Sequence, residues 1–215
     1  MADPPTQVAT SLPPSRRDNP FATCWTRPGA LAFRFEDSQS LEQLVAKLAA
    51  QNWWGQILGP HGSGKSTLLA ALIPALSAAG RRIRKIELSD RSRRLPRNLS
   101  PPSGGDIIVV DGFEELNWLA RLRLKWRCRL ADAGLLVTTH VPMGLPTLVQ
   151  LSPGPRLIEQ LVSDLCAHVP SSITCDDVAA SHASHGSNVR EIFFELYDRH
   201  ERLRRTIRTV GRNTA

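Results

Sequence analysis

The stretch "GPHGSGKST", residues 59–67, decides the fold of this chain, because it combines three glycines with one lysine and three hydroxyl side chains. Glycine tolerates unusual backbone angles, so the N–H groups of residues 62–67 can all point inward at one anion. The apolar run "WWGQIL" (53–58) predicts a buried strand before the loop, and Gly64 to about Ala79 predicts a helix after it. The stretch matches G-x-x-x-x-G-K-S/T in the strand–loop–helix context that this phosphate-binding motif requires.

The loop also predicts which groups would hold a nucleoside triphosphate. The helix that starts near Gly64 aims the positive end of its dipole at the same anion. Lys65 would bridge the β- and γ-phosphates, and Ser66 would offer its hydroxyl to Mg²⁺. We expect the nucleotide to contact the whole loop, which comprises Gly59, Pro60, His61, Gly62, Ser63, Gly64, Lys65, Ser66 and Thr67.

A second motif predicts how the nucleotide would be hydrolysed, which requires a metal and a positioned water. The aliphatic run "DIIVVD" (106–111) is typical of a parallel strand buried on both faces, and it ends at Asp111. A carboxylate at that point can reach the Mg²⁺ that Ser66 would hold. Glu114 and Glu115 follow within one turn and are the candidates for polarising the attacking water. Of the two we prefer Glu114.

Strand and helix patterns alternate through most of the chain. Apolar runs predict five parallel strands with helices between them; their ranges are 53–58, 82–88, 106–111, 135–140 and 147–151. The segment "ALAFRFE" (30–36) suggests a further short strand. We therefore predict an α/β fold, a three-layer P-loop NTPase core with a parallel sheet and a small C-terminal helical lid. The expected divisions are a disordered leader (1–20), the core (21–154), the lid (155–208) and a basic tail (209–215).

These motifs together resemble a family. The phosphate loop, the aspartate that ends an aliphatic strand and the added strand "LLVTTH" (135–140) look like the P-loop ATPases with an inserted strand, which include AAA-plus, STAND and ABC proteins. Within that branch, "DGFEE" (111–115) is most similar to the D-G-h-D/E-E form of the NACHT-type STAND ATPases. Many relatives place a glutamate directly after the aspartate, where this chain has Gly112. That departure leaves the identity of the catalytic glutamate open.

The resemblance also implies two sensors of the nucleotide. "LLVTTH" resembles the sensor-1 strand, whose polar end touches the γ-phosphate or the attacking water. Thr138, Thr139 and His140 are its candidates, with Thr139 first, and His140 also resembles the switch histidine of ABC ATPases. "HGSNVREIFFEL" (185–196) is similar to the G-x-x-R-x-h-x-x-x-L segment of AAA-plus lids. Arg190 would then be sensor 2 and would contact the γ-phosphate.

The helix expected over 114–134 raises two further expectations. AAA-plus rings complete each site with an arginine finger from a neighbour, and the candidates in this chain are Arg121, Arg123, Arg127 and Arg129. The spacing of four between Trp118, Leu122 and Trp126 favours packing against the core or the lid.

Composition limits the remaining classes. The 27 basic and 20 acidic residues give a formal charge of +7, which suits polyanions, so nucleic acid is a possible partner. Four cysteines without metal-ligand spacing predict reduced thiols and a cytoplasmic location. No apolar run is long enough to span a membrane. The guanine motif N/T-K-x-D does not occur, which favours adenine.

The sequence thus predicts a Mg²⁺-ATP-binding ATPase whose slow or partner-stimulated hydrolysis drives closure of the lid. Its partner would be a second copy of the chain or another protein, and the process that it drives stays open. One alternative is a nucleotide-gated binding module without significant turnover. Another is a small-molecule kinase, in which "RSRRLPR" (91–97) would cover the donor phosphates.

Overall fold

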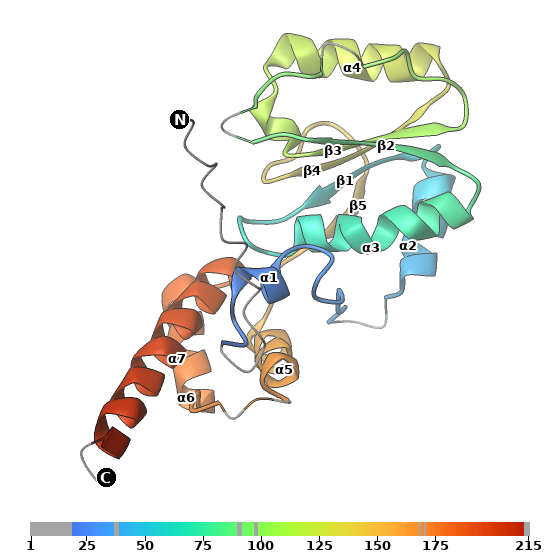
Figure 1. Ribbon diagram of the computed structural model, residues 1–215. Helices are drawn as coiled ribbons and strands as arrows, with labels where there is room; N and C mark the ends of the chain where they lie inside the picture. Colours follow the sequence, from blue (N-terminus) through green and yellow to red (C-terminus); the bar gives the residue numbers. More distant parts are fainter. Residues whose placement is uncertain are drawn as a thin grey trace, which may run out of the picture.

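The computed structural model describes residues 19–36, 39–89, 92–96, 99–167, 169 and 171–212, with the backbone alone for 207–212. Most of the predicted leader, the ends of "RSRRLPR" and the last residues of the basic tail lie outside this part of the chain. Five strands form one parallel sheet in the order β2–β3–β4–β1–β5 (Figure 1). Their bounds are β1 Trp54–Leu58, β2 Arg82–Glu87, β3 Asp106–Asp111, β4 Gly134–Thr139 and β5 Thr147–Gln150. The predicted α/β class is confirmed.

The register of the sheet brings the predicted motifs to one edge. β4 lies between β1 and β3, which is the inserted-strand arrangement that the family resemblance implies. Leu58 of β1 pairs with Thr139 of β4, and Val110 of β3 pairs with Val137 of β4. Because the strands are parallel, their carboxyl ends meet where the phosphate loop begins, the usual place for a ligand in an open α/β sheet.

Helices cover both faces of the sheet and complete the three layers (Figure 1). α2 (Leu41–Ala50) and α3 (Lys65–Ala78) pack on one face, and α4 (Trp118–Leu130) lies on the opposite face. Ser40 begins α2 with a capping box. α3 starts directly after Gly64, whose φ of 92° is a conformation that other residues rarely adopt.

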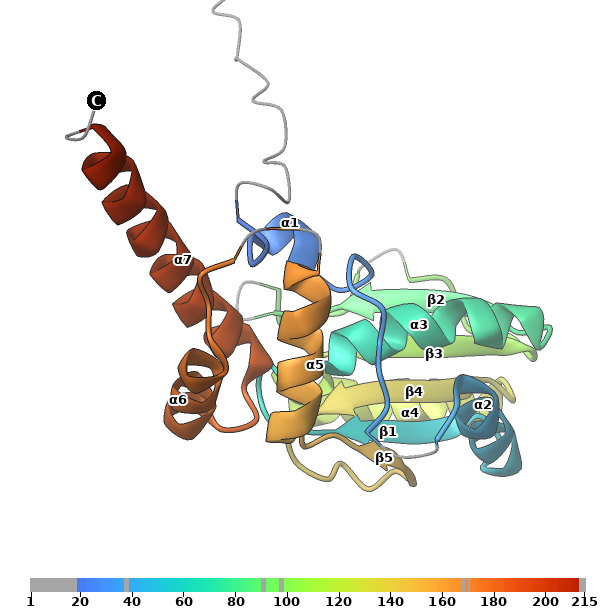
Figure 2. The ribbon, with the colours of Figure 1, turned by 90° about the horizontal axis from the view of Figure 1, so that it is seen from below.

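A C-terminal helical unit packs beside the carboxyl edge of the sheet (Figures 1 and 2). It contains α5 (Pro155–Cys166), α6 (Cys175–His185) and α7 (Val189–Arg212), and it has an apolar core of its own. Phe21, which precedes the short helix α1 (Thr23–Thr26), is buried in that core. The first described residues therefore pack with the helical unit rather than with the sheet.

The segment 30–36 does not form the expected strand. It makes only an isolated bridge between Pro28 and Leu31, because it runs between the sheet and the helical unit instead of along a sheet edge. Arg34 pairs with Asp164 of α5 at 2.7 Å, and Glu36 accepts a hydrogen bond from Gly154 N. These contacts tie the segment to the helical unit.

The expectation that the tryptophans of α4 pack inward is wrong. Trp118, Leu122 and Trp126 are all exposed. Leu124 and Cys128, also four residues apart, face the sheet and are fully buried. Both rows have the same spacing, and only one of them can face the strands. Nothing else in the described chain covers the other row.

Candidate active site

A cavity of about 730 Å³ opens where the phosphate loop, the carboxyl ends of β3 and β4 and the helical unit meet. Its volume lies within the range of sites for nucleotide-sized ligands. The predicted site residues that line it come from four parts of the chain; they are His61 to Thr67, Asp111, Glu114, Glu115, Thr138, His140 and Arg190. Gly59, Pro60 and Thr139 do not line it.

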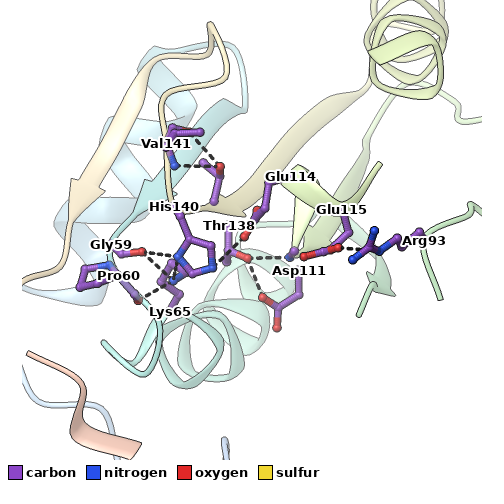
Figure 3. Close-up of polar contacts among 12 residues, drawn as sticks. Gly59, Pro60, Lys65, Arg93, Asp111, Glu114, Glu115, Thr138, His140 and Val141 are labelled. Atoms are coloured by element: carbon purple, nitrogen blue, oxygen red, sulfur yellow. Dashed lines mark hydrogen bonds and ion pairs between the residues drawn. The ribbon is translucent and has the colours of Figure 1, made fainter. Parts of the chain in front are cut away.

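Lys65 is folded back onto its own loop (Figure 3). Its Nζ donates to the main-chain oxygens of Gly59 and Pro60, at 2.7 and 2.8 Å, and lies 3.1 Å from His140 Nδ1. Burial lowers the pKa of Lys65 to about 8, and the nearby carboxylates of Glu114 and Asp111 oppose this shift. The two loop carbonyls thus hold the ammonium group that a phosphate would attract.

His140 links this lysine to a carboxylate. Its Nε2 lies 2.9 Å from Glu114 Oε1, so one ring nitrogen faces a base while the other faces Lys65 (Figure 3). A proton on Nε2 can donate to Glu114, and Nδ1 faces both the ammonium of Lys65 and, at 2.9 Å, the main-chain oxygen of Gly59, so the contacts of Nδ1 alone do not fix its protonation. The ring of His61 stacks on His140 with centroids 3.6 Å apart. Burial, and then the electrostatic influence of the neighbouring His140 and of the Lys65 ammonium, lowers the pKa of His61.

Glu114 keeps one oxygen free. Its Oε2 is buried and has no hydrogen-bond partner among the described residues. Buried polar atoms are rarely left without a partner, which singles out this carboxylate oxygen at the cavity; because the atom is fully buried, a water or ligand reaches it only when Glu114 or its neighbours move. Glu115 differs, because its Oε2 pairs with Arg93 at 3.2 Å and its side chain lies farther from the loop (Figure 3).

Asp111 is held by Thr138 at the end of β3. Thr138 Oγ1 donates to Asp111 Oδ1 at 2.6 Å and accepts from Gly112 N at 2.9 Å. Gly112 has a φ of 82°, and a Cβ on it would come within 3.0 Å of Leu88 O. The residue that departs from the usual family pattern is therefore one whose backbone requires glycine.

Ser66 and Asp111 line the same cavity with a hydroxyl and a carboxylate. Among the described residues, no group of three or more His, Cys, Asp or Glu side chains could form a metal site by itself. This donor set fits Mg²⁺, which is usually bound by one or two protein oxygens together with waters and phosphate oxygens.

Thr139 does not reach the cavity. Its hydroxyl donates to Val141 O at 2.8 Å, and its side chain is fully buried. Successive side chains of a strand point to opposite faces, so Thr138 and His140 share a face that Thr139 does not. That alternation could have grouped Thr138 with His140 from the sequence, but only the pairing of β4 with β3 shows that this pair, and not Thr139, faces Asp111.

The helical unit touches the phosphate loop at Gly62. Arg190, in the first turn of α7, lines the cavity. A Cβ built on Gly62 would lie 1.8 Å from Asn188 Oδ1 and 3.2 Å from Arg190 Cβ. Asn188 Oδ1 also accepts from Glu191 N, which caps the start of α7. Sequence reasoning missed the contact of Asn188 with the loop, because only the packing of the two units creates it.

Solved structures share this fold. A RuvB variant from Thermotoga maritima matches with a TM-score of 0.50 at 18% identity, over 80% of this chain and 61% of RuvB. NtrX from Brucella abortus in complex with ATP matches with a TM-score of 0.53 at 17% identity, over 79% of this chain and 52% of NtrX. NtrX in complex with ADP gives a TM-score of 0.50 at 14% identity, over 73% and 48% of the two chains.

This chain thus spans about half to three-fifths of the length of those proteins. Comparison with family models and with curated proteins gave no match. In the described part of the chain, no helix has the length and apolar character needed to cross a membrane. The position of β4 between β1 and β3, the phosphate loop and the likeness to RuvB and NtrX together show that the chain has a P-loop NTPase fold.

Proposed function

We propose that this chain binds Mg²⁺-ATP and hydrolyses it, slowly or when a partner stimulates it, and that nucleotide binding moves the helical unit as a lid. The supporting observation is that Lys65, Asp111 and Glu114 converge on one cavity of about 730 Å³. NtrX, which has the same fold, forms complexes with ATP and ADP. The absence of a guanine motif favours adenine.

Lys65 neutralises phosphate charge in this proposal, and Ser66 and Asp111 hold Mg²⁺. When bound, the metal would supply positive charge to the phosphate oxygens. Thr138 is a positioning residue, because its hydroxyl fixes one oxygen of Asp111. This role replaces the one that the family resemblance suggested for Thr139.

Glu114 orients the attacking water through its unpaired Oε2, while His140 holds the other oxygen. A carboxylate held at one oxygen by a ring N–H keeps its second oxygen in a fixed direction, which suits a general base. Glu115 forms an ion pair with Arg93 instead. The geometry therefore favours Glu114 over Glu115, and His140 becomes a candidate for sensing the γ-phosphate.

Arg190 reports the γ-phosphate from the helical unit. Arg190 lies in the first turn of α7, beside Gly62 of the phosphate loop, and lines the cavity. A contact between Arg190 and bound nucleotide would therefore move the lid. A second copy of the chain or another protein would use this movement. A cytoplasmic location is proposed because all four cysteines are free.

The test is phosphate release from ATP and GTP with Mg²⁺, compared among the wild type, Glu114→Gln and Glu115→Gln. Glu114→Gln is expected to retain ATP binding and to lose about 10²–10⁴-fold in turnover, the contribution typical of a general base. Glu115→Gln, the matched control, should stay close to the wild type. The opposite ranking would transfer the role to Glu115. Tight ATP binding without release under any condition would replace hydrolysis by a nucleotide-gated binding module.

A further inference from the structure

The outer face of α4 carries a row of large apolar side chains that nothing else in the described chain covers. Trp118, Leu122, Trp126 and Leu130, here called the α4 ridge, follow one another at a spacing of four. They are 69%, 57%, 61% and 67% exposed. The helix lies on the side of the sheet away from α2, α3 and the helical unit, so the ridge is distant from the proposed lid (Figure 1).

The α4 ridge exceeds ordinary surface exposure. A tryptophan side chain offers up to about 250 Å², so the two indoles alone present on the order of 300 Å² of apolar surface. Scattered apolar residues are normal on a protein surface, whereas a contiguous patch of this size usually marks an interaction site.

Positive charge accompanies the ridge. Five of the 13 residues of α4 are arginine or lysine, and none is acidic. Arg123 and Arg127 each follow a ridge residue directly, so they form a parallel row beside it. The complementary surface is therefore one that sets acidic groups next to apolar side chains.

We propose that the α4 ridge docks an amphipathic helix of a partner protein, whose acidic residues face Arg123 and Arg127. A row at i, i+4 is the ridge most often used when helices pack together. At 1.5 Å per residue, the row from Trp118 to Leu130 is about 18 Å long, which matches three turns of a partner helix.

Nucleic acid and a second copy of the chain fit this surface less well. Half of the ridge is leucine, which offers bases no ring on which to stack, so nucleic acid is disfavoured. An anionic membrane surface also attracts a basic helix that exposes tryptophan and leucine, so anionic vesicles are one outcome of the test below. Two copies of α4 packed together would bring their arginine rows close to each other, which like charges oppose.

One residue connects the ridge to the cavity. Arg121 lies on α4, and its Nη2 donates to the main-chain oxygen of Glu114. Its Nη1 also contacts Met143 Sδ at 3.4 Å, in the loop after β4. Docking that shifts α4 would therefore move the backbone that carries Glu114. This coupling to turnover rests on the proposed hydrolysis, whereas the docking does not.

The probe is a synthetic helical peptide of three heptads, with leucine at positions a and d and glutamate at the flanking positions. Binding to the full chain is measured by tryptophan fluorescence and calorimetry. We expect saturable binding that Leu122→Gln and Arg123→Glu each weaken about tenfold, a loss of about 1.4 kcal/mol. Arg156→Glu, the same charge change on α5, should alter affinity less than twofold. Thermal denaturation verifies that each variant is folded.

Three results would overturn the docking proposal. They are absence of peptide binding, equal weakening by Arg156→Glu and Arg123→Glu, and tighter binding of a single-stranded oligonucleotide or of anionic vesicles with the same dependence on Leu122. Phosphate release with and without peptide separates the two proposals. Bound peptide that leaves release unchanged would refute the coupling alone. A chain that binds peptide but never releases phosphate would refute the proposed hydrolysis and leave the docking standing.

Discussion

Nucleotide affinity is expected to fall as the pH rises through the range in which Lys65 loses its proton. Burial lowers the pKa of Lys65 from its ordinary value of 10.5 to about 8. Only the ammonium form neutralises phosphate charge, so Lys65 must carry its proton when ADP binds. With a pKa of about 8, the protonated fraction falls about 25-fold from pH 7.5 to pH 9.5, which is about 1.9 kcal/mol of binding free energy.

Calorimetric titration with ADP at constant ionic strength measures this dependence. Lys65→Arg is the matched control, because a guanidinium keeps its charge across the whole range. The variant is expected to bind more weakly at pH 7.5 and to lose the slope. A wild-type affinity that stays constant to pH 9.5, or an equal slope in Lys65→Arg, would refute control of binding by the lysine proton.

Titration of Lys65 is expected to change the stability of the nucleotide-free chain in the opposite direction: nucleotide affinity falls as the pH rises, whereas the free energy of unfolding rises. Between pH 8 and 10.5 the unfolded chain holds the proton of Lys65 more firmly than the folded chain does. The contribution of Lys65 to the free energy of unfolding therefore rises with pH across this window, and it is lost as the pH falls through about 8. Denaturant titrations of the wild type and Lys65→Arg at pH 8 and 9.5 measure the difference, and a contribution that falls with pH would contradict the assignment.

Two further predictions concern the loop and the strand end. Gly62→Ala should cost more stability than Gly80→Ala, because both have a positive φ, worth about 1–2 kcal/mol, but only Gly62 faces Asn188. Thermal denaturation tests this, and equal losses would remove the contact between lid and loop. Thr138→Val should raise the Mg²⁺ concentration for half-maximal phosphate release, through loss of a charge-assisted hydrogen bond worth about 1.5–3 kcal/mol. Thr139→Val should leave that requirement unchanged, and an equal shift would contradict the role of Thr138.

Much of the fold could be predicted from local sequence. The phosphate loop, the aliphatic run that ends at Asp111 and the five strands each carry a short-range pattern, and the sheet has the expected strands. The segment 30–36 misled because its apolar residues pack against two different units, Leu31 against the core of the helical unit and Phe33 and Phe35 against the core of the sheet, which no periodicity records. On α4 two apolar rows of equal spacing compete, and only the neighbouring strands determine which one is buried.

The sequence predicts which residues form the site, but not which way their side chains point. The loop residues and Asp111 follow from motif and position, whereas the choice among Thr138, Thr139 and His140 depends on which face of β4 meets Asp111. The link from His140 to Glu114 requires two side chains 26 residues apart in the sequence to converge, as the contact at 2.9 Å shows. Only the assembled sheet provides that information.

The pairing of β3 with β4 has a consequence for changes in chain length. Thr138 reaches Asp111 because Val137 pairs with Val110, which places Thr138 next to Asp111 with both side chains on the same face of the sheet. Inserting or deleting one residue inside β4 would exchange the faces of Thr138 and Thr139 while keeping every side chain of the motif. An insertion or deletion in the loop after Val141 would leave Thr138 and Thr139 on their present faces. Related chains are thus expected to vary in length beyond β4 and to keep its length constant.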